Sequence, residues 1–383
     1  MKFFHLSDLH IGLKLMNRDL SEDQANVFAQ IAEAARREQP DAILIAGDVY
    51  DKAVPSAEAV AAFDGFIDLL RGAAPGAELM IISGNHDSAA RLNLFRGVLG
   101  RQRIHMIGLP PQTPDDHIEK VTLEDDFGPV DFFLLPFVKP GMVKEIVGVG
   151  DDGNNLSYDE SLRRLIAREH IDASRRNVLV SHQFYVPAGQ DAASVERMGS
   201  ETVTVGNIDA VGADVLSPFD YAALGHIHKP TRVGSDHHRY CGTPLACSVS
   251  EAGQQKGVVV VEMGKKGDVR ARVIPLVPLR QVRVIKGDLE DVLSQACGDY
   301  VSVVLTGDAG LDAFDLNDRL QAAFPCLLEI RREALRPTDY GPRTEDAEAL
   351  DPLALCEAFL GELDEAERAL LEDAVNAAAE VRA

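Results

Sequence analysis

The chain has 383 residues, more than one compact core usually contains, so we expect at least two domains. Hydrophobic residues make up 46% of the sequence, yet no apolar run reaches the ~18 residues of a membrane helix, which argues against a membrane span. The net charge of −23 argues against indiscriminate binding to nucleic acid.

Cysteine usage and the N-terminus bear on the compartment. The five cysteines are odd in number and contain no C-x-x-C pair, which argues against a disulfide framework and against a thiolate zinc site. The first segment turns polar after six residues, so it predicts a strand rather than a signal peptide. These features predict a cytoplasmic protein.

Residues 1–185 alternate strand-like and helix-like segments. Apolar runs predict strands at Lys2–Leu6, Ala42–Ala46, Glu78–Ser83, Val130–Pro136 and Asn177–Ser181. Helical spacing of apolar residues predicts helices at Gln24–Glu38, Ser56–Arg71, Leu92–Leu99 and Tyr158–His170, with Ser56 as an N-cap. The alternation predicts a layered α/β domain with helices on the sheet faces.

Shorter strand-like segments follow from about residue 220. They lie at Asp220–Leu224, Arg239–Cys241, Gly257–Glu262 and Arg270–Pro275, and they predict a second sheet that completes a sandwich. Residues 151–155 and 234–238 are polar and predict loops. Pro275, Pro278 and Arg280 mark a boundary, so the first predicted domain is 1–276.

The remaining sequence predicts two further parts. Residues 277–336 contain a β-α-β-α-β pattern, which predicts a small α+β domain, and residues 337–345 predict a turn-rich linker. Residues 345–383 hold 12 acidic and two basic residues on a near-helical apolar pattern. An acidic amphipathic helix binds DNA poorly and suits docking to a partner protein, although packing against its own domain remains an alternative.

Polar motifs follow the predicted strands and define a candidate metal centre. They are Asp8-Leu-His10, Gly47-Asp48, Gly84-Asn85-His86-Asp87, Ser181-His182 and Gly225-His226-Ile-His228. Each motif alone occurs by chance, but five in order after apolar runs do not. Their oxygen and nitrogen donors, without sulfur, suit Mn²⁺, Fe or Zn²⁺. Other histidines, such as His5, have no partners at ligand spacing and are expected to pack or to lie on the surface.

The order of these motifs resembles that of the calcineurin-like metallophosphoesterases. The residues around them, including Leu6-Ser-Asp-Leu-His-Ile-Gly12 and Ala223-Leu-Gly-His-Ile-His-Lys-Pro230, resemble the bacterial SbcD branch of that superfamily. The resemblance implies a sandwich of two mixed sheets flanked by helices. It also implies a small α+β capping domain that recognises DNA, followed by a helical tail.

The resemblance implies a role for each motif residue. One metal ion, most simply Mn²⁺, would be bound by Asp8, His10, Asp48 and His228. A second would be bound by Asp48, Asn85, His182 and His226. His86 would contact the scissile phosphate instead of a metal, and Asp51 would orient His86. Two such ions are a recurring device for hydrolysing phosphate esters.

The same resemblance implies an activity and partners. We expect a DNA exonuclease and endonuclease acting on ends and hairpins in DNA repair and recombination. Its partner would be an SbcC-type coiled-coil ABC ATPase docked on the tail, because the chain has no G-x-x-x-x-G-K-[ST] motif of its own. A homodimer through Ser56–Arg71 and Leu92–Leu99 would form a heterotetramer with the ATPase.

Basic residues near the motifs are candidate contacts to DNA phosphates, although each could equally be a solvated charge. They are Lys14, Arg18, Lys52, Arg91 and Lys229. Because fold and metal site do not fix the substrate, a small-molecule phosphodiesterase or phosphatase is the alternative function. A non-catalytic scaffold is disfavoured, since no ligand position is lost.

Overall fold

The computed structural model describes residues 1–187, 189–201, 209–306 and 315–333, together with residues 359, 360, 368 and 371. The chain divides into two units, Met1–Leu305 with Ala309–Arg332 and Thr306–Asp308 with Glu333–Ala383. Almost all of the predicted acidic tail therefore lies outside the described residues. Among the residues that are described, no helix is long and apolar enough to cross a membrane.

The first of two six-stranded sheets begins with the N-terminal strand. Its strands, in spatial order, are β16 (Val269–Pro275), β15 (Gly257–Met263), β1 (Lys2–Leu6), β4 (Ala42–Ala46), β5 (Glu78–Ile82) and β6 (Ile104–Ile107). Strands β1, β4, β5 and β6 are parallel, whereas β15 pairs antiparallel with β1. The carboxyl ends of β1, β4 and β5 therefore lie at one edge.

The second sheet repeats this plan. Its strands, in spatial order, are β13 (Thr231–Val233), β14 (Ser235–Tyr240), β12 (Tyr221–Gly225), β9 (Arg176–His182), β8 (Gly128–Leu135) and β7 (Glu119–Asp125). Strands β8, β9, β12 and β14 are parallel, with antiparallel β7 and β13 at the edges. The predicted loop at 234–238 is wrong from Ser235 onward, because β14 begins there and His238 pairs with Ala222 of β12.

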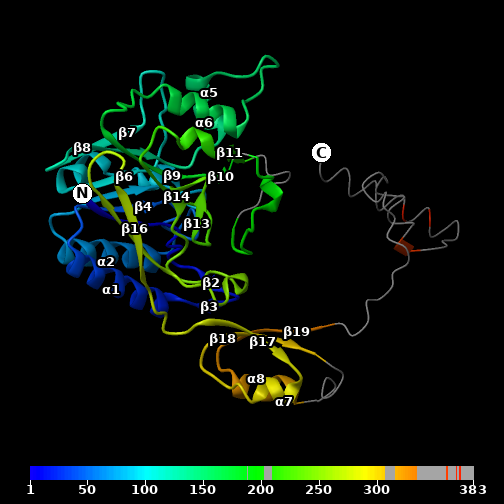
Figure 1. The fold of residues 1–383 in the computed structure, drawn as a ribbon. Coiled ribbons are helices and arrows are strands. Elements are labelled where there is room, and N and C mark those ends of the chain that lie inside the picture. Colours follow the sequence, from blue (N-terminus) through cyan, green and yellow to red (C-terminus); the bar gives the residue numbers. More distant parts are fainter. Residues whose placement is uncertain are drawn as a thin grey trace. The chain divides into compact units, whose positions relative to one another are not determined.

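Four layers, helix, sheet, sheet and helix, form the body of the first unit (Figure 1). In β1, Phe3 packs against Phe132 of β8 between the two sheets, at 5.5 Å between ring centroids. Its neighbour Phe4 belongs to the cluster under helices α1 (Ser21–Glu38) and α2 (Ala57–Ala73). Alternate residues of a strand thus serve both faces of a sheet, which confirms the predicted flanked sandwich.

Helices α5 (Pro140–Val147) and α6 (Tyr158–Ala167) cover the second sheet. The predicted cap of α2 is confirmed, since the Ser56 hydroxyl accepts from the backbone N–H of Ala59 at 3.2 Å. The single predicted helix at Leu92–Leu99 is wrong. The chain forms two four-residue helices, α3 (Ala89–Leu92) and α4 (Arg96–Leu99), because Phe95 adopts the left-handed conformation with φ of 60°.

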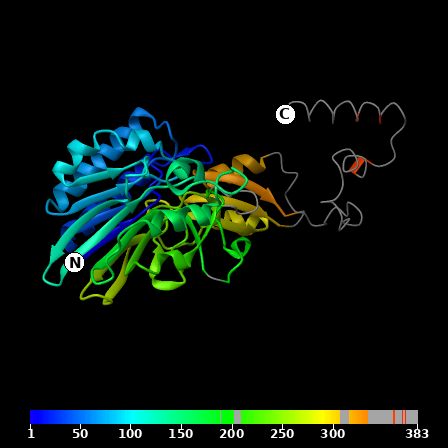
Figure 2. The ribbon, with the colours of Figure 1, turned by 90° about the horizontal axis from the view of Figure 1, so that it is seen from above.

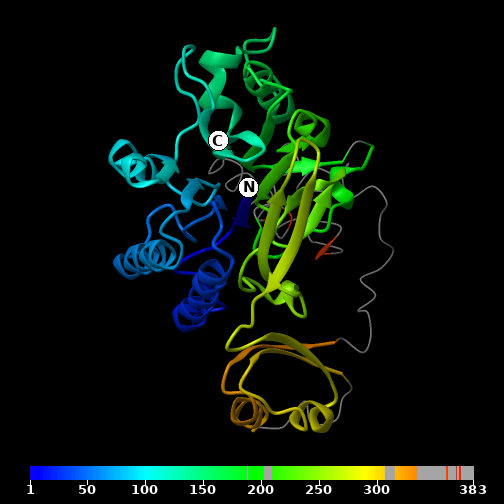
Figure 3. The same cartoon turned by 60° about the vertical axis from the view of Figure 1, so that its left-hand side comes forward.

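A small three-stranded sheet follows the long hairpin of β15 and β16 (Figures 2 and 3). Its parallel strands are β17 (Val282–Gly287), β18 (Tyr300–Leu305) and β19 (Leu327–Arg332), with helices α7 (Leu289–Leu293) and α8 (Leu316–Ala323). This order matches the predicted β-α-β-α-β pattern. The domain boundaries at 276 and 336 stay predictions.

The small sheet contacts α1 through a buried carboxylate. Asp23 Oδ2 accepts hydrogen bonds of 2.8 Å from the Arg280 guanidinium and from the Tyr300 hydroxyl. Asp23 is fully buried, and charge-assisted bonds of this kind offset the cost of burying it.

Candidate metal centre

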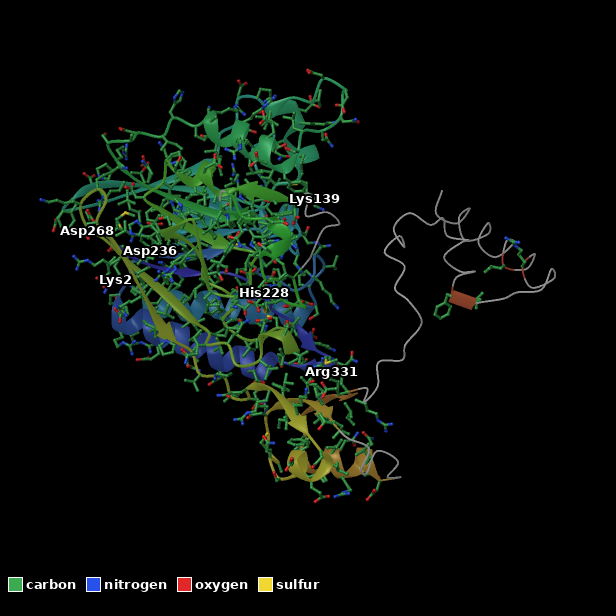
Figure 4. The ribbon with its side chains drawn as sticks, turned by 45° about the vertical axis from the view of Figure 1, so that its right-hand side comes forward. Lys2, Lys139, His228, Asp236, Asp268 and Arg331 are labelled. Carbon is green, nitrogen blue, oxygen red and sulfur yellow. The ribbon has the colours of Figure 1, made fainter. Side chains whose placement is uncertain are left out.

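All five motifs converge at the carboxyl ends of the parallel strands. They follow β1, β4 and β5 of the first sheet and β9 and β12 of the second. In Figure 4, His228 lies on the opposite side of the view from Lys2, which opens β1. The candidate ligands Asp8, His10, Asp48, His182, His226 and His228 are all buried.

The first group of donor atoms centres on two facing imidazoles. Nε2 of His10 and Nε2 of His228 lie 3.1 Å apart. Nε2 of His10 is also 3.8 Å from Oδ2 of Asp48, and Nε2 of His228 is 3.9 Å from Oδ1 of Asp8. Two carboxylates and two imidazoles therefore surround one position.

The second group centres on the amide of Asn85. Its Oδ1 lies 3.0 Å from Nε2 of His182 and 2.9 Å from Nδ1 of His226. Nε2 of His182 is in turn 3.3 Å from Oδ2 of Asp48. The same carboxylate oxygen of Asp48 thus belongs to both groups, while its Oδ1 accepts the backbone N–H of His86 at 2.8 Å.

These spacings fit divalent cations. Ligands ~2.1 Å from one ion are separated by ~3 Å at right angles and by ~4.2 Å when opposite, and the observed distances of 2.9 to 3.9 Å lie mostly within this range. Buried Nδ1 of His10 has no hydrogen-bond partner among the described residues. Without a cation, one of the two facing Nε2 atoms must donate to the other. If His10 donates, its unpartnered Nδ1 is left as a buried acceptor.

The backbone at the centre is strained. Asp8, His10, Asp48 and His226 all have positive φ, an unusual conformation for side chains with a Cβ. Such strain gathers at functional sites, where the surrounding structure holds it. The motif requires a glycine at position 84, because a Cβ there would lie 2.1 Å from Oδ1 of Asp48. The loop after β5 can approach Asp48 only without a side chain.

Hydrogen-bond partners on the side away from the donor groups hold the rings of His182 and His228. Nδ1 of His182 donates to the carbonyl of Ala46 at 2.7 Å, so Nε2 is the nitrogen that faces Asp48 and Asn85. Nδ1 of His228 lies 2.8 Å from the Ser200 hydroxyl and 3.4 Å from Oε1 of Glu251. A carboxylate behind a histidine is the usual support of a metal-binding imidazole.

Two buried ion pairs support this arrangement from outside the motifs. Lys256 Nζ donates to Oε2 of Glu251 at 2.6 Å and to the carbonyl of His228 at 3.0 Å. Arg197 pairs with Glu201 at 2.7 Å, and Glu201 accepts the backbone N–H of His228 at 2.8 Å. Sequence reasoning missed these residues, because none of them stands near a motif in the chain.

Comparison with known proteins places this geometry in a family. The family described as calcineurin-like phosphoesterase matches residues 1–230, which is more than half of the chain. The chain belongs to the calcineurin-like phosphoesterases. It is accordingly a metal-dependent hydrolase of a family that uses divalent metal ions. A second family, described as type 5 capsule protein repressor C-terminal domain, matches residues 278–363.

Individual relatives show which members of this phosphoesterase family the chain resembles. The SbcD subunit of the nuclease SbcCD from Staphylococcus saprophyticus is 34% identical over 297 residues, which cover 77% of this chain and 74% of the relative. That of Staphylococcus epidermidis is 31% identical over 297 residues, covering 77% and 75%. A dimetal phosphatase structure from Danio rerio has 12% identity and a TM-score of 0.41, covering 73% of this chain and 97% of that one. The SbcD resemblance is confirmed.

Asp87 of the phosphoesterase joins two of the site loops. Its carboxylate accepts backbone N–H groups of Val49 at 3.0 Å, Tyr50 at 2.9 Å and Gly84 at 2.9 Å. The loops after β4 and β5 are thereby tied together, and they carry Asp48 and Asn85. The motif contains Asp87, but only the packed loops show this purpose.

His86 stands beside the two donor groups, close to His10 and Asp51. Its Nδ1 donates to the backbone carbonyl of Asp51 at 3.0 Å. Asp51 is the residue expected to orient His86, and its side-chain Oδ1 lies 3.8 Å from Nδ1 of His10. Asp51 thus holds His86 through its main chain.

Burial and neighbouring charges set the pKa values of the phosphoesterase site. Burial raises the pKa of Asp8 to about 6 and lowers the pKa of His10 to about 3. The imidazole of His10 is therefore uncharged near neutral pH, as a metal ligand must be. Burial also opposes the charge of Asp48, yet His182 holds the pKa of Asp48 well below its usual range. Crowding buried carboxylates carries a cost that bound cations offset.

The five candidate DNA contacts differ in their surroundings. Lys52 lines a pocket beside His86, and Lys14 and Arg91 are exposed. Lys229 forms an ion pair with Glu196, and Arg18 donates to the carbonyl of Leu327 at 3.2 Å. Lys52 lines a pocket together with the candidate ligands Asn85 and His226, and Lys14 lines another pocket with Asp51.

Proposed function

We propose that the chain is a two-metal DNA nuclease that hydrolyses phosphodiester bonds at DNA ends and hairpins. The observation that carries the proposal is the single Oδ2 of Asp48 shared between two donor groups, with His86 beside them. The likeness to proteins named as the SbcD subunit of a nuclease supports DNA as the substrate.

Asp8, His10, Asp48 and His228 would hold one cation, and Asp48, Asn85, His182 and His226 the other. The donor set of oxygen and nitrogen suits Mn²⁺, which we propose as the metal. When bound, two divalent cations would lower the pKa of a water and neutralise phosphate oxygens.

His86 would act on the substrate directly. Because its Nδ1–H is engaged by the Asp51 carbonyl, Nε2 is the nitrogen left for the substrate, and in the doubly protonated ring Nε2–H can give a proton or a hydrogen bond. His86 lines a pocket that also contains Asn85 and His226, so a bound phosphate ester can reach it. We assign His86 to protonating the leaving oxygen or stabilising charge on it.

The proposed assembly contains two copies of the chain and an SbcC-type coiled-coil ATPase. The relatives are named as one subunit of a nuclease, and the second family match extends to residue 363. Residues 345–383 would dock the ATPase. Exposed apolar side chains on the α3–α4 segment would join the two copies.

The decisive test compares substrates. Purified protein with Mn²⁺ is incubated with hairpin DNA or with bis(4-nitrophenyl) phosphate, each with and without the ATPase. We expect DNA cleavage that a chelator abolishes and that added Mn²⁺ restores. Hydrolysis of the small ester without cleavage of any DNA would replace the nuclease by a small-molecule phosphodiesterase.

A further inference from the structure

A pocket of about 440 Å³ extends from the metal centre towards helices α5 and α6. His86 and His226 line it beside the donor groups, and Lys52, Phe137, Lys139 and Tyr158 are among its other lining residues. The metal centre accounts for the scissile phosphate alone, so Phe137, Lys139 and Tyr158 have no assigned task, and Lys52 is so far only a candidate contact to DNA.

We propose that this pocket binds the nucleotide next to the scissile phosphate. Lys139 and Lys52 contact its neighbouring phosphate, and the rings of Phe137 and Tyr158 contact its base. The proposal rests on the proposed nuclease function and names the part of the substrate that this pocket takes.

Lys139 is well placed because its backbone is fixed on both sides. After β8, the N–H of Phe137 donates to the carbonyl of Ser83 at 3.0 Å, and the carbonyl of Val138 accepts from Gln183 at 3.1 Å. Lys139 then forms the N-cap of α5. The positive end of that helix adds to the attraction for a phosphate.

Lys52 and Lys139 share the pocket with two carboxylates, Asp51 and Asp209, and the charge of Asp51 acts on Lys52. Neither Lys52 nor Lys139 forms an ion pair with a carboxylate in the part of the chain that the structure describes. Lys229, in contrast, is paired with Glu196. Figure 4 shows Lys139 and His228 on the same side of the view. An ammonium group on an anchored backbone is a common phosphate contact.

The aromatic side chains suit a base. The ring of Phe137 lies 22° from the plane of His226, with 6.4 Å between centroids, so this packing holds it beside the metal centre. Tyr158 opens α6 directly after its Ser157 cap. Bases stack on such rings without sequence preference.

The pocket volume limits the occupant. Small-molecule pockets span ~300–1,000 Å³, and this one is near the lower end. It has room for a single nucleotide, which suits an unpaired nucleotide at a frayed end or in a hairpin loop.

The phosphate contact is tested first by binding, without catalysis. Chelator-treated protein is titrated with a fluorescent single-stranded hexanucleotide, and anisotropy gives Kd at several salt concentrations. We expect Lys139→Gln to weaken binding about tenfold and to lower the slope of log Kd against log salt by about 0.7. The matched control is Lys144→Gln, since Lys144 is exposed on α5 but absent from the pocket lining.

Kinetics with Mn²⁺ separate this subsite from the metal centre. Lys139→Gln should raise KM for the oligonucleotide, and the loss in kcat/KM should be at least about five times larger than with bis(4-nitrophenyl) phosphate. Tyr158→Ala should weaken binding of the hexanucleotide but not of one with an abasic residue at the cleavage position. Equal losses on both substrates, or an unchanged salt slope, would overturn the subsite.

The two proposals fail in different ways. If the unaltered protein cleaves DNA and Lys139→Gln behaves like Lys144→Gln, the nuclease stands and the subsite falls. If the unaltered protein hydrolyses only the small ester, the nuclease falls and the subsite falls with it.

Discussion

Nδ1 of His228 lies 3.4 Å from Oε1 of Glu251, a carboxylate outside every motif. Glu251 is 1% exposed and is bound on its other side by Lys256 and by the Thr243 hydroxyl. The anion directs the Nδ1 hydrogen away from the cluster and so turns the Nε2 lone pair towards it.

Glu251→Gln should therefore lower the affinity for Mn²⁺ about 10- to 100-fold, because the ring of His228 loses its anionic partner. Isothermal titration of the metal-free protein measures this affinity. The control is Glu262→Gln, an exposed carboxylate on β15. Equal Mn²⁺ affinity in the two variants would contradict the orienting role.

His86→Asn tests a residue that acts on the substrate and does not bind or support a metal. We expect Mn²⁺ binding within about threefold of the unaltered protein. DNA cleavage should fall by about 10²- to 10⁴-fold, the usual contribution of general acid catalysis. Electron paramagnetic resonance of Mn²⁺ and a cleavage assay measure the two effects. Loss of bound Mn²⁺ would assign His86 to the ligands instead.

His5 illustrates a histidine that packs. Its Nδ1 accepts from the Tyr221 hydroxyl at 2.9 Å and its Nε2 donates to the carbonyl of Leu224 at 3.2 Å. Burial lowers the pKa of His5 to about 3, while the unfolded chain keeps about 6.5. The unfolded state thus takes up the proton first as pH falls.

Stability from His5 is complete above pH ~6.5 and is lost as pH falls towards ~3. We expect the unfolding free energy to drop by about 2 kcal/mol from this group between pH 7 and pH 5. His5→Gln should reduce that drop, whereas exposed His170→Gln should leave it unchanged. Urea unfolding at both pH values gives the comparison. The same pH dependence in all three proteins would exclude His5 as its source.

At the scale of elements, the parallel strands bring the motifs together. Strands β1, β4 and β5 end side by side, and backbone bonds such as Asp8 N–H to Gly47 carbonyl, at 2.9 Å, tie the loops together. The loop after β5 can approach because Gly84 has no Cβ, and Asp87 then accepts from three backbone N–H groups.

Gly84→Ala should separate these loops. The added Cβ would lie 2.1 Å from Oδ1 and 2.4 Å from the backbone nitrogen of Asp48, so the main chain must move. We expect a loss of about 1–3 kcal/mol in unfolding free energy, as for overpacking, together with weaker Mn²⁺ binding. Gly97→Ala is the control, since nothing lies within 4 Å of its added Cβ. Thermal unfolding and Mn²⁺ titration of both variants decide the matter.

At the scale of the whole molecule, apolar side chains without cover lie on the α3–α4 segment. Leu94, Phe95 and Val98 are 59%, 68% and 62% exposed. Neighbouring exposed apolar groups of this size are typical of protein interfaces. They favour the proposed contact between two copies of the chain.

Phe95→Glu together with Val98→Glu should turn a dimer into a monomer, because two charges would be buried at the contact. Sedimentation velocity measures the mass. Val273→Glu is the control, since Val273 is 49% exposed on β16, in another element. A monomeric unaltered chain, or dimers in all variants, would remove this segment from the interface.

Much of the fold could be predicted because its elements are encoded locally. Ala42–Ala46 is a continuous apolar run buried on both faces, and α2 begins at a serine cap. The failures occurred where distant contacts decide. Polar His238 lies in a strand because β12 offers it a partner, and Phe95 interrupts a helix that its sequence pattern favours.

The sequence by itself determined which residues gather at the candidate metal centre, because each motif follows a strand and parallel strands end at one edge of a sheet. The tertiary structure alone showed what stands behind and beside them. Glu251 supports His228, Glu196 forms an ion pair with Lys229, and Lys139 lines the same pocket as Lys52. Such partners lie far apart in the chain or outside any motif, so only the packing of the sheets and loops brings them together.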